Sequence, residues 1–121
     1  MFISAIVEVN AEQLQQIKDE FHGNQQVCEQ VVGLFHLLSN KVRFRIVCML
    51  LQGEACVQEI ADVVAEGQMS NISQQLRMLR MSGIVAKRRD KKQIQYRIVD
   101  ERIGGLIEFL RCEYLQTKQT T

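Results

Sequence analysis

A polar stretch in the middle of the chain carries side chains that suit the recognition of DNA. Between residues 70 and 80, serine, asparagine, glutamine and arginine alternate with Ile72, Leu76 and Leu79. Hydroxyl and amide groups can form hydrogen bonds with base edges, and guanidinium groups bind phosphates and guanine. We therefore predict a DNA-contacting set of Gln68, Ser70, Asn71, Ser73, Gln74 and Arg77.

A basic run between residues 84 and 99 is the second feature that suits nucleic acid. It holds six Lys or Arg residues against the single acid Asp90, a net charge of +5, whereas residues 1–40 carry −4 and the whole chain only +1. A local concentration of positive charge is expected where a protein meets phosphates. We expect Arg88, Lys91 and Lys92 to contact DNA.

Four cysteines, at positions 28, 48, 56 and 112, are the remaining reactive side chains. The apolar start of the chain lacks a basic flank and is interrupted by Glu8, so we expect no signal peptide. No apolar run is long enough to cross a membrane. The sequence therefore predicts a cytoplasmic protein without a membrane partner, in which the cysteines are reduced thiols rather than a disulfide framework.

Helical periodicity dominates the first half of the chain. Asn10 and Gln13 have the spacing of a capping box, and Gly23 can end the helix that follows. A wide apolar stripe predicts a second helix up to Leu38, and Ser39 or Asn40 can cap a third. With 121 residues, we expect a single domain over residues 1–121, with an N-terminal arm and helix at about 1–23.

The second half predicts a helix-turn-helix followed by a wing. A short helix with Val57 and Val64, a turn at 65–68 and a helix at about 70–81 precede a change to period two. Residues 84–89 and 94–98 then predict a hairpin, and Asp100 can cap a final helix. A solvated helix face alone would explain the polar residues at 70–80, and a lysine-rich edge strand alone would explain the basic hairpin. The occurrence of both features in this order favours a mainly α winged helix-turn-helix with a small β-hairpin.

The apolar stripes point to a homodimer. Leu34, Phe35 and Leu38, with the seam of the last helix, exceed what one thin winged-helix core can cover. That seam consists of Ile103, Leu106, Ile107, Leu110 and Tyr114. A two-fold interface would bury the excess and place two recognition helices one DNA turn apart.

Across about residues 25–115 the chain resembles the ArsR/SmtB family of bacterial repressors. The resemblance rests on stretches 38–46, 70–76, 79–85 and 93–98, read as LSNKVRFRI, SNISQQL, LRMSGIV and QIQYRI. It implies a homodimer packed through its first and last helices, a recognition helix, a β-wing and release from operator DNA by an inducer. The turn before Ser70 is one residue longer than the family pattern.

The metal-binding branches of that family are matched poorly. The arsenic, lead and cadmium branch has Cys-x-Cys where this chain has Cys56 and Gln58, so one thiolate is missing. The zinc branch uses Asp and His on the last helix, which here has no His; His22 and His36 precede residue 40. We therefore predict no metal site and no cofactor, with Cys56 and Cys28 as the alternative thiolate set for arsenic or another metal.

The persulfide- and redox-responsive branch is similar at Cys48. Its second thiol lies near the end of the last helix, where Cys112 falls one turn before the family position, here Leu115. At about 100° per residue, Cys112 points away from the seam and shares a side with Gly105 and Phe109. We predict that Cys48 and Cys112 are the sensor thiols, while a non-sensing role for a buried Cys48 stays open.

Two other classes of function compete with a repressor. Catalysis needs convergent titratable groups in a pocket, and the chain has no phosphate loop, nucleophile-elbow motif or paired carboxylates, so we predict that it is not an enzyme. A winged helix that binds protein rather than DNA is the other alternative. Salt-sensitive binding to the DNA upstream of its own gene would distinguish the two.

Overall fold

The computed structural model describes residues 7–64 and 69–119, with side chains described as far as Glu113. The chain divides into two compact units, residues 1–36 and 37–121. The predicted turn at 65–68, and with it Gln68, lies outside the described residues. None of the described helices is long and apolar enough to span a membrane.

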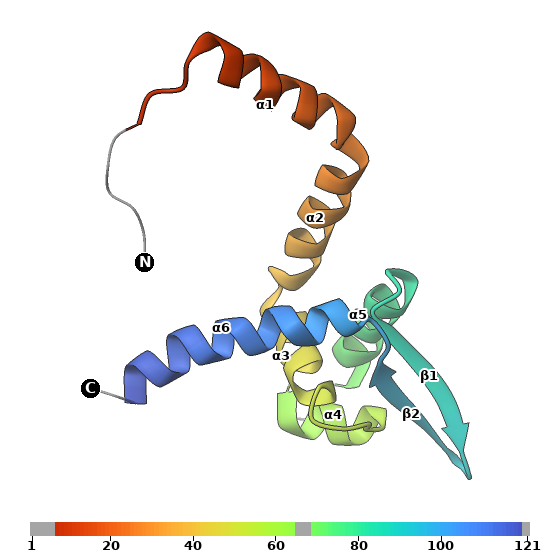
Figure 1. Ribbon diagram of the computed structural model, residues 1–121. Helices are drawn as coiled ribbons and strands as arrows, with labels where there is room; N and C mark the ends of the chain where they lie inside the picture. Colours follow the sequence, from red (N-terminus) through yellow and green to blue (C-terminus); the bar gives the residue numbers. More distant parts are fainter. Residues whose placement is uncertain (1–6, 65–68, 120–121) are drawn as a thin grey trace. The chain divides into compact units, whose positions relative to one another are not determined.

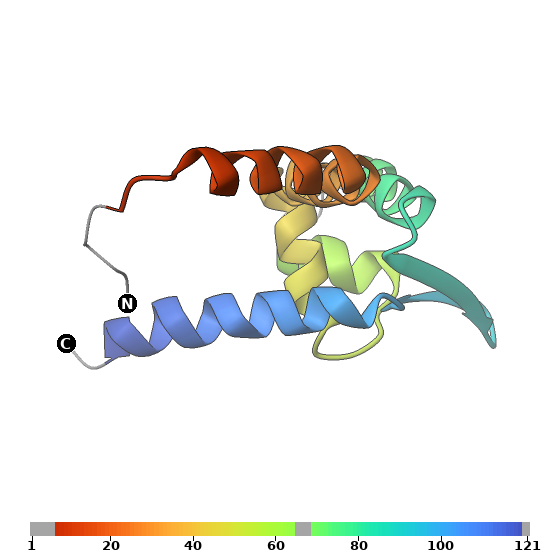
Figure 2. The same cartoon turned by 45° about the horizontal axis from the view of Figure 1, so that its top comes forward.

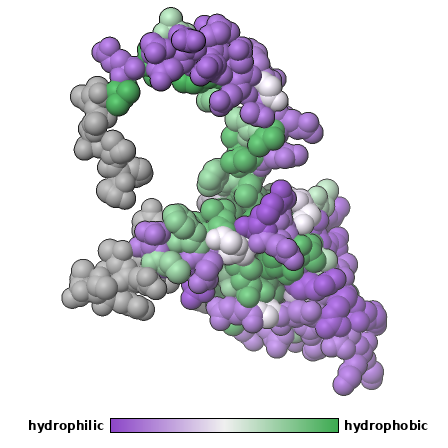
Figure 3. All heavy atoms as spheres, viewed as in Figure 1, coloured by the Kyte–Doolittle hydropathy of each residue, from purple (hydrophilic) through white to green (hydrophobic). Residues whose placement is uncertain are grey.

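The first unit is built from two helices, α1 (Ala11–Gly23) and α2 (Gln25–Leu38), of which α2 runs on into the second unit (Figure 1). The predicted capping box is present: Asn10 Oδ1 accepts the N–H of Gln13 at 2.8 Å, and Gln13 Oε1 accepts the N–H of Asn10 at 3.0 Å. No residue of α1 is buried. The two helices present large apolar side chains to solvent, and green patches along α2 mark them in Figure 3.

The second unit is the winged helix. Helices α3 (Lys41–Leu50), α4 (Val57–Val64) and α5 (Met69–Met81) precede strands β1 (Val85–Asp90) and β2 (Gln93–Ile98), and α6 (Glu101–Gln119) follows. Of the two predicted cap residues, Asn40 caps α3, and its side chain accepts the N–H of Arg43 at 2.9 Å. Helices α3, α4 and α5 pack on one another, and β2 contacts α3 and α4. The predicted order of elements, and with it the winged helix-turn-helix, is confirmed.

The core of this unit is made by one apolar face from each helix. Its fully buried side chains are Ile46, Val47, Ile60, Ile72, Leu76, Leu79, Ile103 and Ile107. The sequence predicts that the seam of the last helix is larger than this core can cover. Of that seam, Ile103 and Ile107 lie in the chain's own core, while Leu106 and Leu110 are half-buried. Helix α6 is thus anchored to the winged helix by residues one turn apart.

The hairpin is a regular antiparallel ribbon that extends away from the helices (Figures 1 and 2). Its register pairs Val85 with Ile98 and Asp90 with Gln93, so Lys91 and Lys92 form the tip. Lys91 adopts φ 61°, a left-handed conformation that costs a non-glycine residue free energy. At the base, Tyr96 and Ala55 exchange two backbone hydrogen bonds of 2.8 and 3.2 Å, which tie the wing to the segment before α4.

Glycine in the interior of α6 makes that helix less stable than it could be. A Cβ added at Gly104 would meet Leu51 Cδ2 at 3.5 Å, an ordinary van der Waals contact. We expect Gly104→Ala to raise the free energy of unfolding by about 0.5–1 kcal/mol, because alanine loses less backbone entropy in a helix. Urea titration of the variant against the wild type measures this, and a lower midpoint would contradict the packing of α6 on Leu51.

Candidate DNA-binding site and cysteine thiols

Helix α5 has one face in the core and one in solvent. Ile72, Leu76 and Leu79 are buried, and the predicted DNA-contacting residues Ser70, Ser73, Gln74 and Arg77 are exposed or half-exposed. Asn71 is half-buried, and its Oδ1 accepts a hydrogen bond from Gln75 Nε2 at 3.1 Å. The core thus fixes which side of α5 can meet a ligand, and that side carries short polar and cationic groups.

A polar hollow of about 280 Å³ lies between α5 and the hairpin. Its lining residues are Ser73, Arg77, Arg80, Lys87 and Tyr96. Three cations and two hydroxyl groups, with no carboxylate among the lining residues, form a set that suits a phosphate group. Ser73 and Arg77 belong to the predicted DNA-contacting set, and Arg80 ends the predicted polar stretch at 70–80. Lys87 and Tyr96 were not predicted to contact DNA. The charge of the 84–99 run was the only sequence signal for Lys87.

The wing presents its cations in two different ways. Arg88 is held by Glu54: Nη2 lies 2.8 Å and Nε 2.9 Å from Glu54 Oε1, and this carboxylate raises the pKa of Arg88. Lys91 and Lys92 are exposed at the tip, and neither pairs with an acid among the described residues. Figure 3 shows the hairpin surface as hydrophilic. The tip lysines are therefore free to meet a phosphate, whereas Arg88 must first leave Glu54.

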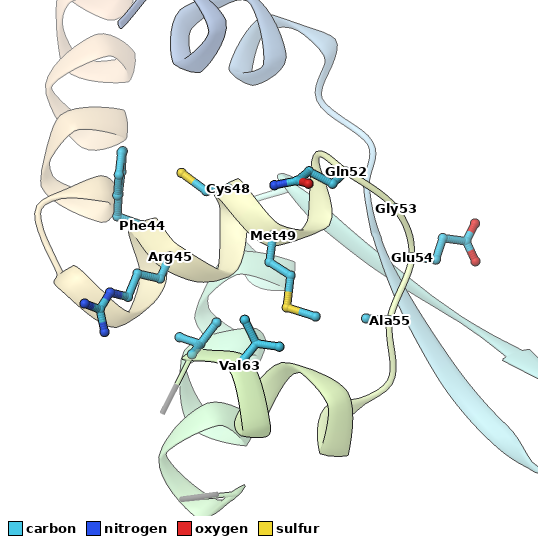
Figure 4. Close-up of a pocket in the computed structure, with 10 residues that line it drawn as sticks. Phe44, Arg45, Cys48, Met49, Gln52, Gly53, Glu54, Ala55 and Val63 are labelled. Carbon is cyan, nitrogen blue, oxygen red and sulfur yellow. The ribbon is translucent and has the colours of Figure 1, made fainter. Parts of the chain in front are cut away.

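Cys48 lies half-buried on α3 and lines a cavity of about 620 Å³ with Phe44, Met49 and Val63 among its neighbours (Figure 4). Its side chain points away from Met49, which is directed toward Val63. Burial raises the pKa of the Cys48 thiol, and the positive charge of Arg111 on α6 acts in the opposite direction. The thiol is therefore mostly protonated near neutral pH, with a cation nearby that favours the reactive thiolate.

Cys112 follows Arg111 directly but lies on an exposed part of α6. Its Sγ donates a weak hydrogen bond to Glu108 Oε1 at 3.8 Å, one turn earlier. All four cysteines are free thiols. The side chain of Leu115, the family's thiol position, lies outside the described set.

The alternative thiolate set is divided between the two units. Cys28 is exposed in the first, and Cys56 is buried in the second, where its backbone N–H donates to Glu59 Oε1 at 2.9 Å and lowers the pKa of that carboxyl. Within residues whose placement is described, no group of three or more His, Cys, Asp or Glu side chains could hold a metal ion.

The fold and this site define a class: a winged helix-turn-helix DNA-binding regulator with a basic wing. The family model of the bacterial regulatory proteins of the arsR family matches residues 40–87, from the cap of α3 into the wing. The biofilm growth-associated repressor of Xylella fastidiosa is 42% identical over 81 residues, which cover 67% of this chain and 70% of the relative. This chain belongs to the arsR family and is a transcriptional regulator, not an enzyme, as the sequence predicts.

Solved structures of related regulators share this fold. Reduced HlyU from Vibrio cholerae is 30% identical with a TM-score of 0.69, covering 74% of this chain and 94% of its own. A homodimeric winged helix-turn-helix DNA-binding domain from Mycobacterium bovis, described as a possible ArsR-family regulator, has 26% identity and a TM-score of 0.69. It covers 81% of this chain and 90% of its own length.

Proposed function

We propose that this chain is a cytoplasmic repressor that binds operator DNA as a homodimer. The observation that carries the proposal is the hollow shared by α5 and the hairpin, because its cations and hydroxyls form a phosphate site beside the exposed polar residues of α5. In this arrangement Ser70, Asn71, Ser73 and Gln74 read base edges. Arg77, Arg88, Lys91 and Lys92 bind the phosphate backbone. The named relative from Xylella fastidiosa is a repressor.

The inducer acts on the thiols of Cys48 and Cys112 in this proposal. Two observations support it: Cys48 is half-buried beside a cavity, and the residue preceding Cys112 is close enough for its charge to act on the Cys48 thiol. One solved relative is described in its reduced form. A polysulfide or another mild oxidant would take two electrons from the two thiols, which release two protons and form one S–S bond.

In this proposal, closing such a bond moves α6. A disulfide needs its two Cα atoms within about 7 Å, and Cys112 is turned by about 100° from Arg111 around the helix axis. Since Ile103 and Ile107 of α6 lie in the core of the winged helix, a turn of α6 disturbs that core and shifts α5. A coupling free energy of about 1–3 kcal/mol is enough for a useful switch.

Operator binding by cysteine variants tests the thiol proposal. Wild type treated with a polysulfide should lose about 5- to 150-fold in affinity, the equivalent of that coupling, and regain it with a thiol reductant. Cys48→Ser and Cys112→Ser should each resist the treatment, while Cys28→Ser serves as a control for an exposed thiol. If Cys48→Ser responds like wild type, the thiol switch is wrong, and arsenite titration of Cys28→Ser and Cys56→Ser then tests the alternative set.

A further inference from the structure

Arg43 is a buried charge held entirely by neutral groups. It is 8% exposed, and it is the only buried charged side chain among the described residues. Its Nε donates to the backbone carbonyl of Leu37 at 2.7 Å, and its Nη1 donates to Gln75 Oε1 at 2.7 Å and lies 3.4 Å from Met78 Sδ. A buried charge is costly unless it is satisfied. Here the guanidinium is satisfied by contacts that reach from the end of α2 to the recognition helix.

The contact with Gln75 fixes the direction of the next hydrogen bond. A guanidinium can only donate, so Gln75 must turn its amide oxygen toward Arg43. The amide nitrogen of Gln75 then faces Asn71 and donates to Asn71 Oδ1 at 3.1 Å. The orientation of an amide is ordinarily ambiguous, since either end can bond to another amide. In this chain of contacts the donor-only guanidinium removes the ambiguity at both amides.

The hydrogen bond from Gln75 engages the oxygen of Asn71 and leaves its amino group as the end available to a ligand. Asn71 is only half-buried. We propose that Arg43, acting through Gln75, makes Asn71 a hydrogen-bond donor toward DNA and thereby determines which bases this position accepts. The proposal rests on the base-reading role of Asn71 proposed above. Arg43 and Gln75 are positioning residues in it, and Asn71 is the residue that touches the base.

A donor at this position selects for acceptors on the base edge. In the major groove, guanine offers two acceptors, O6 and N7, and thymine (O4) and adenine (N7) offer one each, whereas cytosine presents only an amino donor. The usual bidentate recognition of adenine needs the asparagine oxygen to accept from the adenine amino group, and here that oxygen already accepts from Gln75. The position should therefore prefer guanine, which offers two acceptors, over cytosine, which offers none.

Gln75→Glu is the variant that separates this role from a merely structural one. A glutamate still accepts from Arg43, so the buried charge stays satisfied, but its carboxylate cannot donate to Asn71. Asn71 is then free to reverse its amide and to accept from an adenine. Met81→Glu adds the same charge to an exposed position of α5, away from this network, and serves as the matched control.

The experiment is selection of bound duplexes from a randomised operator library, with wild type, Asn71→Ala, Gln75→Glu and Met81→Glu. The position that loses its preference in Asn71→Ala is the one that Asn71 reads, and if no position changes, the base-reading role of Asn71 fails. At that position wild type should favour guanine over cytosine by about fivefold or more. Gln75→Glu should lose this preference, and Met81→Glu should keep it. An unchanged preference in Gln75→Glu overturns the proposal.

A second measurement needs neither DNA nor a variant. In the free protein the side-chain amide protons of Gln75 should exchange slowly with solvent, because they are bonded to Asn71, and those of Asn71 should exchange fast. NMR hydrogen exchange on the wild type measures both. The reverse order would overturn the proposed direction of the hydrogen bonds, whatever the outcome of the library selection.

Discussion

Replacing Lys91 by Gly together with Lys92 by Gln should flatten the salt dependence of DNA binding. Removing one phosphate contact reduces the slope of log affinity against log salt by about 0.9. The proposed homodimer carries two wings, so the variant removes four contacts and reduces the slope by about 3.6. Between 50 and 200 mM salt, wild type should therefore lose roughly a hundredfold more affinity than the variant. Glycine is chosen at position 91 because it adopts the observed φ of 61° without strain, so the hairpin stays intact.

The control removes the same charge elsewhere. Lys18 lies on α1 and Arg102 at the start of α6, where Arg102 pairs with Asp100 at 2.9 Å. Lys18→Gln with Arg102→Gln lowers the net charge by the same amount without touching the wing. Fluorescence anisotropy with a labelled operator, repeated over a salt series, measures the operator affinity of all three proteins. Equal slopes for wild type and the wing variant would show that the tip does not contact phosphates.

The ion pair at the base of the wing changes what is expected of Arg88. Arg88 is bonded to Glu54 in the free protein. The binding free energy that Arg88 contributes on contact with a phosphate is therefore reduced by the loss of that ion pair. Arg88→Gln should therefore weaken binding less than the replacement of a tip lysine does. The charge run in the sequence ranks Arg88, Lys91 and Lys92 alike, since the partner of Arg88 lies 34 residues earlier in the chain.

Periodicity and capping predicted most of the fold. The Asn10 and Asn40 caps, the helix at 70–81 and the alternation at 94–98 are local signals, and the structure has each within about a residue of the predicted place. These features depend on hydrogen bonds and side-chain spacing within a few residues. For the same reason the order of elements, and with it the winged-helix class, could be predicted from the sequence.

The contacts that organise the site could not be predicted in the same way. Arg43 belongs to a helix whose pattern is apolar, and nothing near it in sequence indicates a bond to Gln75, 32 residues later. The last helix is apolar on two sides, so periodicity alone could not tell which side faces the core. Both cases depend on which helices pack together, and that is set by the whole chain rather than by one segment.

Adding charge to α2 should separate the proposed dimer. Val31 and Phe35 lie one turn apart on α2 and are 45% and 59% exposed, and Leu14 and Phe21 on α1 are exposed as well. Large apolar side chains gathered on two helices are expected where a second copy packs. We expect Val31→Asp with Phe35→Asp to sediment as a monomer at micromolar concentration, where wild type sediments as a dimer.

The loss of the dimer should also weaken DNA binding, because each monomer carries only one recognition helix. Two linked helices on a palindrome bind with a high effective concentration for the second half-site, and avidity of this kind is worth about 10²- to 10⁴-fold. The variant should lose operator affinity by at least about the lower of these factors, while its circular dichroism keeps the helical signal of the folded winged helix. Gln25→Asp with Gln26→Asp places two charges at the start of α2, away from the face of Val31 and Phe35, and should remain a dimer with wild-type affinity. A variant at positions 31 and 35 that still sediments as a dimer would contradict this interface, and a monomeric wild type at the same concentration would contradict the dimer itself.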